Sequence, residues 1–150
     1  MFMNLSKLIL IASLALLSAC SSVKHTLPEV VENAGAVLQL NDIWALESIQ
    51  GEALLLSGDI KRPMLEINLR DMKVIGNDSC NGIFASIDDL DSERITFGPI
   101  AGTLMLCHPM EIAERFKQQL NNVKTYHLKE LKLHFFDEAG EELLTFRKVD

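Results

Sequence analysis

The sequence lacks the features of a membrane-spanning or nucleic-acid-binding protein. The longest apolar stretch, residues 8–17, is too short to cross a bilayer as a helix, which takes about 20 residues. Acidic residues outnumber basic ones, 21 to 14, and no basic cluster with interleaved aromatic residues offsets the net charge of −7. An acidic surface repels phosphate backbones, so we expect no nucleic-acid partner.

Signatures of catalysis and metal binding are also missing. There is no Cys-x-x-Cys redox motif and no Gly-x-Ser-x-Gly elbow, so we attribute the co-occurrence of Asp78, Ser79 and His108 to chance composition. The acidic run 88–93 lacks the glycine and downstream glutamate of an EF-hand and is typical of a solvated hairpin tip. We therefore expect no catalytic residue, no cofactor and no metal site.

What the sequence does contain begins with an export signal. Lys7 precedes the apolar run, which ends in Leu17-Ser18-Ala19-Cys20 and so resembles a bacterial lipobox. The resemblance implies cleavage after residues 1–19, acylation of Cys20 with chains such as palmitate, and, because Ser21 is not acidic, transfer to the outer membrane. Several buried acyl chains would hold the protein on the membrane without a spanning helix. The alternative is an ordinary signal peptide with Cys20 as a bystander.

Residues 20–39 then read as a lipidated N-terminus and tether, and residues 40–150 as one domain. From position 43 onward short runs alternate between apolar and polar residues, which indicates strands near 43–50, 65–69, 73–75, 83–87 and 95–97. Later strand-like runs cover 125–128, 131–136 and 142–146, with a hairpin turn at 137–140.

One segment has helical spacing. Apolar residues recur every three or four positions from Ile112 through Phe116 and Leu120 to Val123, and Pro109 suits the first helical position. Because the strands follow one another as hairpins, the sheet should be mainly antiparallel. The predicted class is α+β: a small, mainly antiparallel β domain of about seven or eight short strands with one packed α-helix.

Three short patterns and their order resemble the META domain, the HslJ-like group of bacterial envelope proteins. They are Trp44-Ala45-Leu46 with Gly51, then Gly76-x-x-x-Cys80-Asn81, then Thr103-x-Met105-x-Cys107, and they continue through the helix to Leu143-Leu144-x-Phe146. The match spans roughly residues 40–148. It marks Gly76, Asn81, Thr103 and Met105 as structural motif residues, and we expect Met105 to fill the core.

The resemblance implies a small antiparallel β fold and no established enzymatic activity. Members are associated with the heat-shock response, envelope integrity and antibiotic tolerance. Two positions depart from the family pattern: Ser79 replaces a glycine before the first domain cysteine, and Leu106 replaces an alanine before the second. Ser79 puts in doubt a positive-φ turn at that position, because glycine alone adopts one without strain.

Three interpretations of Cys80 and Cys107 compete. An exported chain meets an oxidising periplasm, and lipidation of Cys20 leaves an even pair, which favours a structural disulfide contributing about 3.5 kcal/mol in the chain-entropy model. The alternatives are a reduced, buried pair, and a redox dithiol or metal site with His108. We expect the disulfide.

The function predicted from the sequence is that of a non-enzymatic, outer-membrane-anchored lipoprotein facing the periplasm. Its domain would support envelope integrity or stress response through contacts with envelope proteins or the envelope itself. The alternative function is small-ligand binding or sensing through a pocket between sheet and helix.

Overall fold

The computed structural model describes residue 35 and residues 37–149. The predicted signal peptide 1–19, lipidated Cys20 and most of the predicted tether 20–39 lie outside the described residues. The strands are β1 (Ile43–Ile49), β2 (Glu52–Ala53), β3 (Met64–Asn68), β4 (Lys73–Asn77), β5 (Gly82–Leu90), β6 (Ile95–Phe97), β7 (Ala101–Gly102), β8 (Thr125–Lys129), β9 (Lys132–Phe136) and β10 (Glu142–Lys148), and the helix is α2 (Glu111–Asn121). No helix among these residues is long and apolar enough to cross a membrane.

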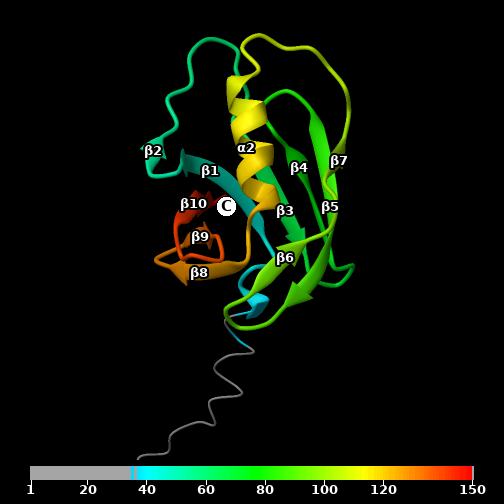
Figure 1. The fold of residues 1–150 in the computed structure, drawn as a ribbon, viewed down its shortest axis with the longest axis vertical. Helices are drawn as coiled ribbons and strands as arrows, with labels where there is room; N and C mark the ends of the chain where they lie inside the picture. Colours follow the sequence, from blue (N-terminus) through cyan, green and yellow to red (C-terminus); the bar gives the residue numbers. More distant parts are fainter. Residues whose placement is uncertain (1–34, 36, 150) are drawn as a thin grey trace, which may run out of the picture.

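The strands form one antiparallel sheet in the order β6-β5-β4-β3-β1-β10-β9-β8, with β2 paired to β1 and β7 paired to β5. The two outer strands, β6 and β8, lie next to each other. Arg94, just before β6, forms an isolated antiparallel backbone bridge with Thr125 of β8, and the amide of Tyr126 donates to the carbonyl of Glu93 at 2.8 Å. The sheet thus nearly closes on itself, as Figure 1 shows. The predicted α+β class is confirmed, and alternation missed only the two-residue strands β2 and β7.

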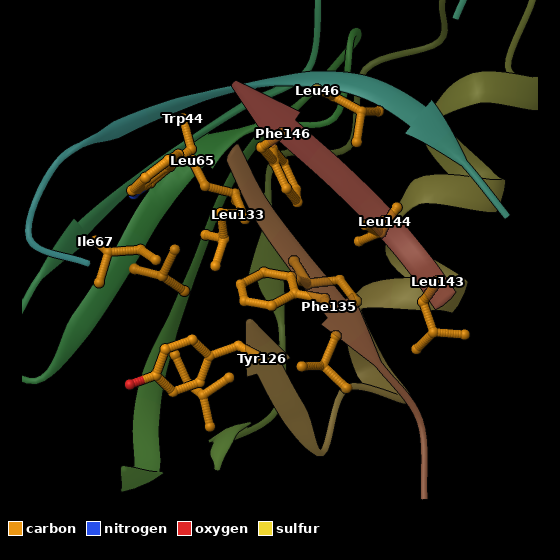
Figure 2. Close-up of a cluster of buried hydrophobic side chains, with 14 of the residues drawn as sticks. Trp44, Leu46, Leu65, Ile67, Tyr126, Leu133, Phe135, Leu143, Leu144 and Phe146 are labelled. Carbon is orange, nitrogen blue, oxygen red and sulfur yellow. The ribbon is translucent and has the colours of Figure 1, made fainter. Parts of the chain in front are cut away.

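The core fills the inside of this curved sheet. Trp44, Leu65, Phe135 and Phe146 are almost completely buried, and their side chains point toward one another from β1, β3, β9 and β10 (Figure 2). Phe146 makes edge-to-face contacts with Phe135 and with Phe116 of α2, at ring-centroid distances of 5.5 and 6.2 Å. The phenol of Tyr126 on β8 donates to the carbonyl of Asp91, in the segment between β5 and β6, and so joins the two ends of the sheet. Burial raises the pKa of Tyr126 to about 12.

The helix α2 packs against β10 and β1 with Ala113, Phe116 and Leu120 buried. The predicted apolar face is therefore present, but the predicted start at Pro109 is wrong. The helix begins at Glu111, because Cys107 is tied to the β4–β5 turn and residues 108–110 must connect that point to the helix. A cleft of about 320 Å³ lies between the first turns of α2 and the β1–β2 hairpin, lined in part by Ile49, Ala53, Ile112 and Arg115.

Candidate functional site

The predicted motif residues meet at one place, where the β4–β5 turn (residues 78–81) lies against the segment after β7 (residues 103–107). We call this place the disulfide junction. The sulfur atoms of Cys80 and Cys107 are bonded, and their Cα atoms lie 5.8 Å apart across a sequence separation of 27. The bond fastens a segment without regular secondary structure to the turn of the β4–β5 hairpin.

Asn81 connects the two halves of the junction by hydrogen bonds. It is 3% exposed, and its side-chain oxygen accepts from the hydroxyl of Thr103 at 3.0 Å and from the amide of Met105 at 2.7 Å. The hydroxyl of Thr103 in turn accepts from the amide of Gly82 at 3.2 Å. Buried polar groups that are mutually satisfied hold a loop in one geometry.

Glycine and a strained serine shape the turn itself. A Cβ at Gly76 would collide with the carbonyl oxygen of Met64 on β3, so close approach of the two strands requires glycine there. Ser79 has φ 88°, so the positive-φ turn that its side chain put in doubt is present. A non-glycine residue in that region costs about 1–2 kcal/mol, which the hydrogen bonds and the disulfide around it offset.

In the segment 103–107, residues that are bonded to the rest of the domain alternate with two exposed leucines. Thr103, Met105 and Cys107 are bound to the domain through a hydroxyl, a backbone amide and a sulfur, respectively. Between them Leu104 is 98% exposed and Leu106 is 95% exposed. The expectation that Met105 fills the core is wrong: its side chain is 54% exposed, and its role in the motif lies in its backbone.

Sequence reasoning missed the contribution of Asp78. It is fully buried, and its Oδ1 accepts from the amides of Cys80 and Asn81 at 3.0 and 2.6 Å, which closes the turn. Its Oδ2 has no hydrogen bond among the described residues and lies 3.8 Å from Nζ of Lys117 on α2. The Asn-Asp-Ser run before Cys80 is a turn signal that pointed to this role.

A cleft of about 560 Å³ opens beside the junction, lined in part by Asp59, Lys61, Ser79, Met105 and His108. Both sulfur atoms here are in the disulfide, so neither is a thiolate ligand or nucleophile. Ser79 and His108 share the cleft, yet they make no hydrogen bond with each other in the described structure. The disulfide therefore removes both thiols from the candidate nucleophiles of this cleft.

Comparison with protein-family profiles matches residues 36–150 to the META domain. The chain belongs to the META domain family. The match includes every residue of the disulfide junction and the whole described sheet. No curated protein matches the chain.

Two solved structures have a fold similar to the one described above. One is the NMR structure of a protein 20% identical in sequence, with a TM-score of 0.55 over 73% of this chain and 90% of the other. The second is the NMR structure of a protein from Burkholderia xenovorans, also 20% identical, with a TM-score of 0.58 over 78% of this chain and 88% of the other. At this identity the likeness concerns the fold alone.

Proposed function

We propose that this META domain protein is a non-enzymatic lipoprotein, anchored at the outer membrane through Cys20, that supports the envelope under stress by binding a partner protein through Leu104 and Leu106. The observation that carries the proposal is the pair of fully exposed leucines on a segment held by a disulfide and by Asn81. A rigid apolar loop loses little conformational entropy when it binds.

The position of the loop favours a protein partner over the anchoring membrane. The segment that joins β7 to α2 lies at the opposite end of the domain from the segment that leads into β1 (Figure 1). A domain tethered through its N-terminal side would thus present Leu104 and Leu106 away from its own anchor. Leu106 is also the position where the family pattern has alanine, so the apolar surface is enlarged in this chain.

Photo-crosslinking in the native envelope tests the contact. We expect a crosslinker at position 106 of the full-length protein to yield one adduct of defined mass, and Leu104→Ser to reduce its yield at least fivefold. Position 131 is the matched control, since Leu131 is 69% exposed on the β8–β9 turn. Equal adducts from both positions, or none from position 106, would overturn the proposed contact.

The anchor is tested separately by intact mass and membrane fractionation. The expected mass is that of a chain starting at Cys20 with acyl chains attached, and Cys20→Ala should release the protein from the membrane fraction. An unacylated wild-type protein in the soluble periplasm would contradict the anchor and leave the crosslinking result standing.

A further inference from the structure

A second cleft lies on the outer face of the sheet, away from the disulfide junction. It has a volume of about 530 Å³ and is lined by residues of β1, β9 and β10, by β2 with its flanking residues, and by Arg62, which precedes β3. We call it the β9–β10 cleft. Its basic residues are Arg62, Lys132 and Arg147, and its acidic residues are Glu47 and Glu142.

Strand register places these side chains outside the core. Leu133 and Phe135 of β9 and Leu144 and Phe146 of β10 belong to the core (Figure 2), so His134, Thr145 and Arg147 lie on the opposite face of the sheet, where Thr145 is 7% exposed and Arg147 is exposed. On that outer face Thr145 is paired with His134, and Arg147 is paired with Lys132. Two cations thus sit directly opposite each other, an arrangement that destabilises a sheet.

Both acidic residues of the cleft already have ion-pair or hydrogen-bond partners within the protein. Glu47 binds Nζ of Lys132 at 2.7 Å. Glu142 lies 2.8 Å from Nδ1 of His134 and accepts from the hydroxyl of Thr145 at 2.8 Å. Burial raises the pKa of Glu142, but these two hydrogen bonds outweigh it and leave the pKa lowered, so the acid is ionised and its partners are held in place.

Two guanidinium groups keep unused donors. Arg62 donates from Nη1 to the carbonyl of Leu46, which positions its side chain and leaves its other N–H groups available. Arg147 is exposed, and its side chain makes no hydrogen bond or ion pair within residues 37–149. In a chain with net charge −7, three bases against two acids leave this cleft locally positive.

We propose that the β9–β10 cleft binds a small carboxylate-bearing ligand between Arg62 and Arg147. A guanidinium group presents parallel N–H donors that match the two oxygens of a carboxylate. One excess positive charge suits a single carboxylate, and the cleft volume suits a small molecule or the C-terminus of a short peptide. The ligand would also relieve the repulsion between Arg147 and Lys132.

Titration followed by NMR of backbone amides and arginine Nε–H groups tests the assignment with two probes, benzoate and N-acetyl-trialanine. We expect shifts at Arg62, Arg147 and Thr145 with at least one probe, no such shifts with the C-terminally amidated peptide, and at least tenfold weaker binding after Arg147→Gln. A response to benzoate alone indicates a free organic acid, and a response to the peptide acid indicates a chain terminus.

Arg70→Gln is the matched control, because Arg70 is an exposed arginine outside the cleft. It should leave both titrations unchanged, while Arg147→Gln should bind less without a lower melting temperature. The proposal is overturned if neither acid shifts the cleft, if the amide binds as well as the acid, if phosphate binds more tightly than either acid, or if Arg147→Gln has no effect.

Discussion

The disulfide junction and the β9–β10 cleft are built in different ways. The junction joins loop segments that are far apart in sequence, and a covalent bond, Asn81 and Asp78 hold them together. The cleft lies mainly on paired antiparallel strands, where register brings Thr145 and Arg147 opposite His134 and Lys132. The junction exposes leucines, whereas the cleft exposes cations.

This difference shows which interactions each surface needs. A loop without ladder hydrogen bonds is held in one conformation by crosslinks and buried acceptors. Loss of one of them should therefore strongly destabilise that loop relative to the rest of the domain. Side chains on a paired strand are held by the backbone, so single substitutions there should alter charge more than structure.

The largest expected effect comes from removing the crosslink. Cys80→Ser combined with Cys107→Ser should lower the free energy of unfolding by about 3–4 kcal/mol, because the unfolded chain regains the entropy of an open loop. Urea unfolding measures this loss of free energy. Hydrogen exchange should accelerate in residues 103–107, while the amides of β9 and β10 should exchange no faster than the lower global stability requires. An unfolding midpoint equal to that of wild type would contradict the structural role of the bond.

Asn81→Ala should cost about 1–3 kcal/mol, since it removes a buried acceptor and leaves the part-buried amide of Met105 without its partner. Thr103→Val is the matched control, because it removes a single hydroxyl from the same network and should cost about 1 kcal/mol. If the two variants unfold at the same urea concentration, the hydrogen bond from the amide of Met105 to Asn81 stabilises the protein no more than the hydrogen bond from the hydroxyl of Thr103.

Ser79→Gly should stabilise the protein by about 0.5–1 kcal/mol, because glycine adopts φ 88° without steric strain. The gain is smaller than the strain itself, since glycine also increases the entropy of the unfolded chain. Ser79→Ala removes the hydroxyl and keeps the strain, so it should show no gain in thermal or urea unfolding. A stabilising alanine would mean that the side chain, not the backbone, is unfavourable.

The smallest effect is expected in the cleft. The folded-state pKa of Glu142 is below its ordinary value of 4.5, so its contribution to stability is present above that pH and is lost as pH falls through the folded pKa. Glu142→Gln should therefore lower stability by less than about 1 kcal/mol near neutral pH, and the difference from wild type should shrink on acidification.

Unfolding curves across the acid range measure this dependence. Glu138→Gln serves as control, since Glu138 is exposed on the neighbouring turn and its side chain makes no ion pair or hydrogen bond in the described part of the chain. A difference between wild type and Glu142→Gln that is constant with pH would show that the carboxylate is not the source of the effect.

Much of the fold followed from sequence because its signals are local. Alternation around Leu65, Ile83 and Leu133 predicted strands that are present, and the recurrence of Phe116 and Leu120 predicted the buried face of α2. The two-residue strands β2 and β7 were missed, since alternation has no meaning over two positions. The helix start was misplaced at Pro109 because a capping signal takes no account of a distant crosslink.

The sequence by itself determined the α+β class, the META resemblance and the motif residues Gly76, Cys80, Asn81, Thr103 and Cys107, because patterning and spacing are properties of the chain. Tertiary structure decided that the side chain of Met105 faces solvent, that Leu104 and Leu106 are exposed together, and that Arg62 joins Arg147 in one cleft. The physical reason is that exposure and charge proximity depend on which strands pair and which segments cross, and those contacts join residues far apart in sequence.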